Sequence, residues 1–383
     1  GLLITSALPS TGSMCKLSVW LVCLSCAQCC LYTISFRSSD EYLSDASYAE
    51  RNASTMEHDN ESAELSSVRT LLLSLNPAIG LGQRHAWRSM LRVHPQQLPL
   101  QNTFTSRSES VQMQATVRGT SVSSLLNVNR RLVDSLASVA DVSEITRLRF
   151  ALAFPNQFEA QRALRETLAW RQGAGRAIVD SAAKAVAQAT SGGAWDNEVV
   201  RAAAPHAAAI NQFITPKNIL TLSTDEGDLV YVIRSSLIDD RALMSRVSVQ
   251  QLVDFLLYVK EVHSLVADAR SEKSGRLCKV LFANDISGIS SIPDQRFSDA
   301  LTKSSQQYER LYPSLAGPTM ILNLPFILQA FVGLLKPLFP KSVQDRLLFM
   351  PAPFLARLRD LSPLTSNANS RKSFIAEVKR LLP

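Results

Sequence analysis

The spacing of hydrophobic and polar positions becomes regular in the last two-thirds of the chain and predicts several helices there. Asn156, with an acidic residue three positions later, predicts a helix start, and Gly173 and Gly175 predict its end. A capping box at residues 248–251 predicts the start of a longer helix with an apolar stripe. Pro293 suits the first turn of a further amphipathic helix.

Short segments rich in β-branched and apolar residues lie between these helices. They predict strands over residues 228–235, 276–284, 319–323 and 346–350. Strands separated by helices of this length imply βαβ crossovers. The pattern therefore predicts an α/β fold with a mainly parallel sheet.

One predicted helix, residues 325–339, is apolar on nearly every side, interrupted only by Gln329 and Lys336. It is shorter than the roughly 20 residues that cross a bilayer. Because a surface helix needs a polar side, this segment is either buried all round or covers something apolar that is not protein. Lys336, Lys341 and Arg346 flank it, an arrangement typical of segments that enter an anionic membrane interface.

The N-terminal part has a different character. Residues 17–36 carry no charge, which predicts a signal peptide or membrane anchor within residues 1–36; a buried core helix is the alternative. Residues 37–65 carry a formal charge of −6, and residues 66–130 carry +6, from seven arginines and a single acid, Glu109. We interpret residues 37–127 as a linker or a transit-like region. This arrangement favours endomembrane or plastid targeting of a membrane-associated protein, with the cytoplasm as the alternative.

Composition narrows the function. A net charge of +7 over 383 residues does not predict nucleic-acid binding. Five of the six cysteines fall in the first 30 residues, so Cys278 has no disulfide partner in the folded part. The chain lacks the sequence motifs of hydrolases, metalloproteases and nucleotide-binding enzymes. His263 is expected to pack within its helix or to lie at the surface rather than act as a base, and Asp285 to cap the turn through Gly288. We therefore expect no catalysis, cofactor or metal.

The order of several motifs resembles the CRAL-TRIO family of lipid-binding proteins, including phosphatidylinositol and phosphatidylcholine transfer proteins. Two segments resemble its helical N-terminal module, residues 147–150 and 158–171. Five more follow in the family's order over the next part of the chain: residues 227–233, 284–290, 308–313, 321–325 and 335–339. The resemblance covers roughly residues 145–350.

The resemblance implies a bowl-shaped α/β domain over residues 205–383, preceded by a small all-α module over residues 128–193. Its mainly parallel sheet would floor an apolar pocket for one lipid, which is the only ligand expected. Residues 326–339 match the family's mobile gate helix, which would cover the lipid and open at a membrane. The gate and pocket residues expected from this match are Phe326, Leu328, Phe331, Val332, Leu335 and Phe339.

The headgroup pattern of the family's phosphatidylinositol transfer members carries over only in part. Arg346 falls on their phosphate-binding lysine, Ser314 replaces a glutamate, and Ser342 lies beside Val343, which replaces a threonine. Tyr231 and Ser290 match positions that some members use for phosphatidylcholine-type heads. Inositol lipid, another phospholipid and a different hydrophobic ligand all remain open.

Two functions fit the resemblance. The first is a monomeric lipid carrier that exchanges ligand with anionic membranes. The second is a membrane-tethered lipid sensor without net transfer, which the N-terminal apolar run favours.

Overall fold

The computed structural model describes residues 121–382 except residues 194, 290–292 and 325–345. Its helices before the sheet are α5 (Val122–Ala137), α6 (Glu144–Ala153), α7 (Gln157–Gln172), α8 (Arg176–Thr190), α9 (Asn197–Ala202) and α10 (Ala207–Ile210). The strands are β1 (Ile219–Ser223), β2 (Leu229–Arg234), β3 (Val280–Asp285), β4 (Ala316–Leu322) and β5 (Leu347–Met350). Between and after them lie η1 (Ser235–Leu237), α11 (Asp240–Arg246), α12 (Val249–Ser274), α13 (Gln295–Leu311), α16 (Pro353–Ala356), α17 (Ser362–Ser366) and α18 (Ala368–Leu381).

The five strands form one sheet in the order β1-β2-β3-β4-β5. Strands β2 to β5 are parallel neighbours, so the predicted mainly parallel α/β fold is confirmed. Strand β1 pairs antiparallel with β2 through a turn in which Gly227 has a φ of +95°. Strand β1 was not predicted from the sequence, because this five-residue edge strand alternates apolar and polar residues and has no continuous apolar run like those of the predicted strands.

The helix starts predicted at Asn156 and Ser248 are confirmed. The Asn156 side chain accepts from the backbone N–H of Glu159 at 2.9 Å, because the first turn of α7 lacks intrahelical partners. Ser248 and Gln251 form the reciprocal bonds of a capping box at the start of α12. Helix α13 begins at Gln295 with Asp294 as its cap, immediately after Pro293.

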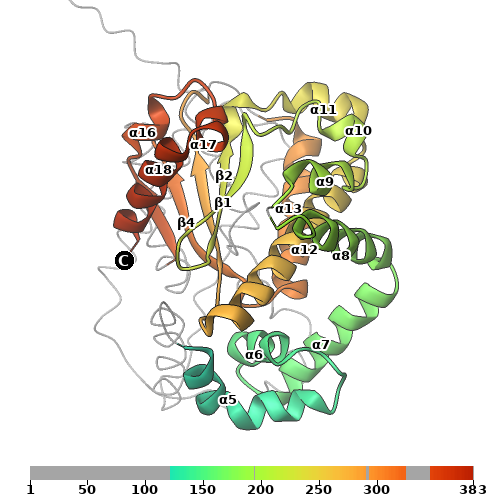
Figure 1. Cartoon of the computed structure of the whole chain (residues 1–383). Coiled ribbons are helices and arrows are strands. Elements are labelled where there is room, and N and C mark those ends of the chain that lie inside the picture. Colours follow the sequence, from blue (N-terminus) through green and yellow to red (C-terminus); the bar gives the residue numbers. More distant parts are fainter. Residues whose placement is uncertain (1–120, 194, 290–292, 325–345, 383) are drawn as a thin grey trace, which may run out of the picture.

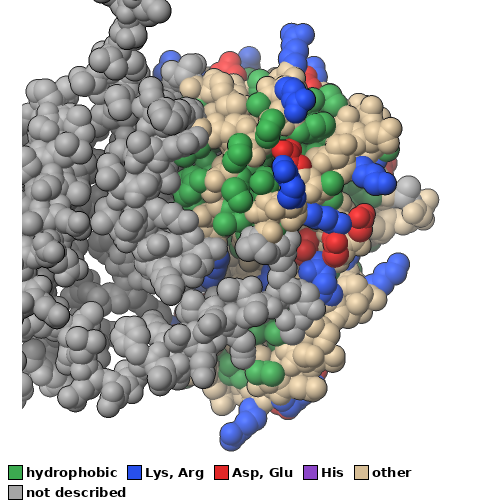
Figure 2. Space-filling view, turned by 90° about the vertical axis from the view of Figure 1, so that its left-hand side faces the viewer, with side chains coloured by type: hydrophobic (Ala, Val, Ile, Leu, Met, Phe, Trp, Pro, Cys, Tyr) green, Lys and Arg blue, Asp and Glu red, His purple; other side chains and the backbone are tan. Residues whose placement is uncertain are grey.

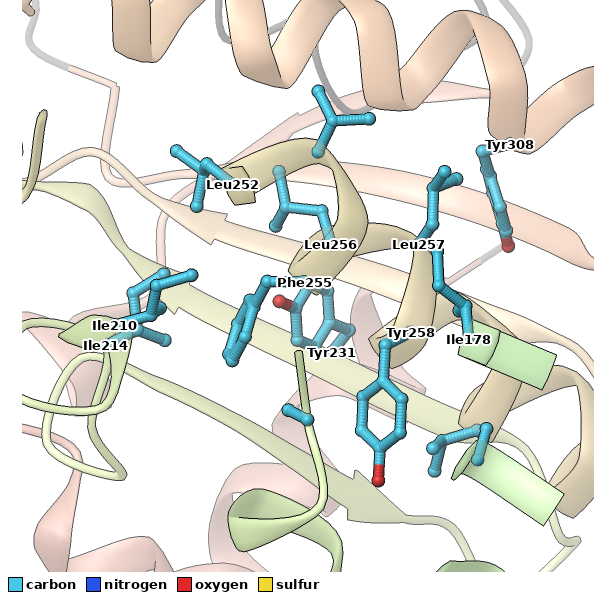
Figure 3. Close-up of a cluster of buried hydrophobic side chains, with 14 of the residues drawn as sticks. Ile178, Ile210, Ile214, Tyr231, Leu252, Phe255, Leu256, Leu257, Tyr258 and Tyr308 are labelled. Atoms are coloured by element: carbon cyan, nitrogen blue, oxygen red, sulfur yellow. The ribbon is translucent and has the colours of Figure 1, made fainter. Parts of the chain in front are cut away.

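The sheet separates two layers of helices (Figure 1). Because side chains alternate along a strand, Leu229, Tyr231 and Ile233 face α12 and α13, whereas Val230 and Val232 face α16 to α18. The larger core cluster joins α8, α10, β2, α12 and α13, and Figure 3 draws part of it. Figure 2 views the α16–α18 side, where Lys and Arg side chains are spread among hydrophobic ones.

Helices α5 to α7 form a separate helical cluster at one end of the molecule (Figure 1). Two arginines attach it to the sheet domain. Arg149 of α6 bonds Asp268 of α12 at 2.7 Å, and Arg171 of α7 makes two bonds with the fully buried Glu261, at 2.8 and 2.6 Å. The described helices begin at Val122, so they extend beyond the 128–193 module expected from sequence.

Several predictions lie outside the described residues. These are the segments 1–36 and nearly all of 37–127, the gate residues Phe326, Leu328, Phe331, Val332, Leu335 and Phe339, and the headgroup residues Ser290 and Ser342. Of the helices that are described, none combines the length and the apolar character needed to cross a membrane.

A buried ion pair joins the sheet to its C-terminal helices. Arg234 at the end of β2 contacts Asp285 at the end of β3 at 2.6 Å, with both side chains almost fully buried. The same guanidinium donates to the carbonyls of Leu355 and Leu358. The expected turn-capping role of Asp285 is present, since its carboxylate also accepts from the backbone N–H of Ser287 at 3.1 Å.

Replacing Arg234 with Met should lower the free energy of unfolding by about 3–5 kcal/mol, because Asp285 would keep a buried charge without its partner. Urea unfolding measures the loss. Arg130→Met is the matched control: Arg130 contacts Glu144 at 2.8 Å, but the two side chains are 46 % and 45 % exposed. That variant should lose about 1 kcal/mol or less. Equal losses would contradict the role given to the buried pair.

Candidate ligand cavity

A cavity lies between the sheet and helices α12 and α13. Its volume is about 120 Å³, compared with the roughly 10–15 Å³ that one water needs on the same measure. Most of the described residues around it are apolar, including Ile214, Ile219, Ile233, Leu252, Leu256, Val259, Phe282, Ile289, Phe297 and Leu301. The space therefore suits several connected methylene groups better than a polar metabolite.

Aromatic rings form part of the cavity wall. Tyr231 of β2 meets Phe282 of β3 edge to face at a centroid distance of 6.1 Å, and Phe282 meets Tyr308 of α13 at 6.0 Å. Burial raises the pKa of Tyr231 far above its usual value, so its hydroxyl stays neutral. Edge-to-face contacts hold these rings in fixed orientations and give the wall a rigid apolar surface.

His263 of α12 also lines the cavity. Its Nε2 lies 2.9 Å from the hydroxyl of Thr221 on β1, and its ring meets Tyr231 edge to face at 5.0 Å. Burial, with the nearby charge of Lys260, lowers the pKa of His263 from 6.5 to about 3. The imidazole is therefore neutral at pH 7, and the expectation that His263 packs within its helix is met.

Lys260 brings a cation to the same wall. Its ammonium donates to the hydroxyl of Ser304 at 3.2 Å and lies 5.0 Å from the centre of the Tyr308 ring. Both contacts come from α13, so Lys260 links the two helices that cover the cavity. Cation–π contact of this kind stabilises a partly desolvated ammonium.

The described headgroup candidates occupy different places. Tyr231 lines the cavity, whereas Ser314 and Arg346 are absent from its described lining. The Ser314 carbonyl accepts from Arg149 at 3.1 Å and from Lys279, which immediately precedes β3. The Arg346 carbonyl accepts from the backbone N–H of Thr319 at 2.9 Å, just before β5 begins. Ser314 and Arg346 thus sit at the amino ends of the parallel strands.

Charge is concentrated at those amino ends. Burial, together with the positive charges of Arg149 and Arg346, lowers the pKa of Lys279 from 10.5 to about 7. The opposite, carboxyl ends of β2 and β3 carry Ser235, Ser236 and Gly288, which line the cavity. The structure therefore does not bring Tyr231, Ser314 and Arg346 together around one space.

Several residues in or beside the cavity were not predicted from the sequence. Ser235 follows Tyr231 and Ile233 at alternate positions, so continuing the strand pattern would have placed it on the same face. Lys260 and Thr221 carried no signal, because their relevance depends on which helix and strand lie opposite them. Among residues 121–382 that the structure describes, no His, Cys, Asp and Glu side chains gather into a metal site.

Comparison with known families agrees with this geometry. Residues 215–362 match the family model of the CRAL/TRIO domain, a span that includes all five strands and both helices over the cavity. No curated protein matches the chain. The chain therefore contains a CRAL/TRIO domain, as the motif order predicted, and domains of this family bind hydrophobic ligands.

The buried His263 predicts a sensitivity to acid. Below pH 6.5 the unfolded chain binds a proton at this imidazole, whereas the folded chain binds none until about pH 3. The free energy of unfolding therefore decreases as the pH is lowered through this window. In His263→Gln, the drop in unfolding free energy between about pH 6.5 and pH 4 should be smaller by roughly 2–3 kcal/mol.

Denaturant unfolding at several pH values measures this effect. His206→Gln, at an exposed histidine, is the matched control for loss of an imidazole. A wild-type pH dependence in His263→Gln would show that the ring is not held neutral by its surroundings.

Proposed function

We propose that the protein binds one lipophilic molecule in the cavity beneath α12 and α13 and exchanges it with membranes. The observation that carries this proposal is the mostly apolar cavity on the sheet face, within the span that matches the CRAL/TRIO domain. Burying each methylene contributes about 0.8 kcal/mol, so such a space binds an acyl or ring system without a charged contact.

The ligand class proposed first is a phospholipid, with its phosphate near Arg346. The support comes from the motif resemblance and from the suitability of a guanidinium for phosphate. Arg346 is half-buried at the amino end of β5, and its positive charge, with that of Arg149, acts on the nearby Lys279, whose pKa is lowered to about 7. This grouping of cations would favour an anionic group at that end of the sheet.

We propose that the protein acts as a monomer and without catalysis. His263 hydrogen-bonds Thr221 and is neutral, and Asp285 is engaged with Arg234, so neither is arranged as an acid or base toward the cavity. Turnover of esters or phospholipids by the purified chain would contradict this proposal.

Filling the cavity should abolish uptake. Val259 of α12 lines it, and Val259→Trp would occupy the volume of two or three ligand methylenes. Their exclusion predicts a loss of lipid affinity of about tenfold or more. Val128→Trp is the matched control, because Val128 is 66 % exposed on α5. Binding of labelled lipid by the delipidated chain measures both variants, and equal binding would place the ligand elsewhere.

We further propose that residues 326–339 act as the gate. The apolar sequence of this segment supports the proposal. Its position in the sequence, after β4 and before the neighbouring parallel strand β5, also supports it. Phe331→Asp combined with Leu335→Asp should stop exchange with vesicles, since opening would bury charge in hydrocarbon. Lipid already bound should stay bound. Exchange at the wild-type rate would contradict the gate.

Basic residues Lys336, Lys341 and Arg346 should favour docking on anionic membranes, each by about 1 kcal/mol near the surface. Equal exchange with anionic and neutral vesicles would remove this part of the proposal.

A membrane-tethered lipid sensor is the second candidate, and the uncharged run at residues 17–36 favours it. Transfer of labelled lipid between two vesicle populations distinguishes the two functions. A carrier moves the lipid between populations, whereas a tethered sensor binds it without net transfer.

A further inference from the structure

Two buried polar side chains near one end of the cavity have no hydrogen-bond partner among the residues that the structure describes. Asn284 is fully buried, and neither its Oδ1 nor its Nδ2 is bonded. The hydroxyl of Ser235 is also buried and unpartnered. A buried amide without a partner costs about 1–3 kcal/mol, so its presence in an otherwise apolar region requires an explanation.

Both residues lie at the carboxyl ends of neighbouring strands β2 and β3, on the face of the sheet that carries the cavity, although only Ser235 is part of its described lining. Asn284 follows Phe282 by two positions and therefore faces the same side of the sheet. Its register partner on β2 is Ile233, and both Phe282 and Ile233 line the cavity. Ser235 lines it directly, just beyond the end of β2.

Several other polar groups in or beside the cavity are paired. Ser298 donates to the carbonyl of Asp294 at 3.3 Å, and the Asp240 carboxylate accepts from the backbone N–H of Asp294 at 2.7 Å. Thr221 and His263 bond each other. At the carboxyl ends of β2 and β3, by contrast, the Asn284 amide and the Ser235 hydroxyl are buried without a hydrogen bond to any described residue.

The chemistry of this end favours an uncharged oxygen. An amide and a hydroxyl each donate and accept, which matches a lipid hydroxyl or an ester carbonyl. The adjacent Arg234 guanidinium is bonded to Asp285 and to two carbonyls. The Asp240 carboxylate also lines the cavity and would repel an anion.

We propose that Asn284 and Ser235 form a hydrogen-bonding subsite for an uncharged oxygen of the bound lipid. This inference rests on the proposed lipid-binding function and adds a recognition element to it. The oxygen comes either from a lipid alcohol or from an ester group, and the probes below separate these sources.

The experiment compares three probes with the same chain length: oleyl alcohol, methyl oleate and 1-octadecene. Binding of each radiolabelled probe to the delipidated full-length chain is measured for wild type and for Asn284→Leu, which replaces the amide with an apolar group of similar size. The variant should lose about tenfold in affinity for the alcohol, the ester or both, and none for the alkene.

The melting temperature of the ligand-free protein provides an independent test of the subsite. Because Asn284→Leu removes an unpartnered buried amide, the ligand-free variant should melt at a higher temperature than wild type. A lower melting temperature with equal losses for all three probes would assign the amide a structural role and overturn the inference.

Serine variants give a matched pair that does not depend on the Asn284 variant folding. Ser235→Ala should weaken binding of the oxygen-bearing probes by about threefold or more. Ser181→Ala is the matched control, because this half-buried serine of α8 lies outside the described cavity lining and its hydroxyl already donates to the carbonyl of Ala203 at 2.7 Å; it should leave binding unchanged. Equal effects of the two variants would overturn the subsite.

The outcomes also separate this inference from the proposed function. Loss for the alcohol alone identifies a hydroxyl ligand, and loss for the ester alone identifies a carbonyl. Wild type that binds all three probes, with no probe-specific loss in the variants, would overturn only the subsite. Wild type that binds none of these probes, and no phospholipid, would overturn lipid binding itself.

Discussion

The position of the cavity depends on the order in which the parallel strands follow one another across the sheet. Strands β2, β3 and β4 follow one another across the sheet, and each connection between them contains a helix. Because such crossovers have one hand, consecutive steps in the same direction place α12 and α13 on the same face. The cavity is the space that these two helices leave above the floor formed by Tyr231, Ile233 and Phe282.

The two faces of the sheet differ for a physical reason. On one, Val230 and Val232 pack against the short C-terminal helices in a filled core, which the Arg234–Asp285 pair fixes to the strand ends. On the other, the rings of Tyr231, Phe282 and Tyr308 line a mostly apolar cavity between the strands and helices α12 and α13. One face thus provides rigidity, and the other keeps a space that an apolar ligand would fill.

Polar groups in or beside this space have two kinds of role. Thr221 with His263 and Lys260 with Ser304 hold neighbouring elements together, and their hydrogen bonds are made within the protein. Asn284 and Ser235 have no such bonds, so their desolvation is not offset in the ligand-free state. A ligand oxygen that bonds these groups would offset this cost, so the protein would become more stable when the ligand is bound.

Sequence alone determined the local features of this protein. Runs of β-branched and apolar residues predicted four strands, and capping residues predicted the helix starts at Asn156 and Ser248, since these signals depend on neighbours a few residues apart. Motif order indicated the domain family. Only the tertiary structure placed Tyr231 in the cavity and Ser314 and Arg346 at the far strand ends, because strand register and helix crossover decide which distant residues meet. For the same reason, Asn284 looked like an ordinary strand residue until the structure showed its amide buried and unpaired.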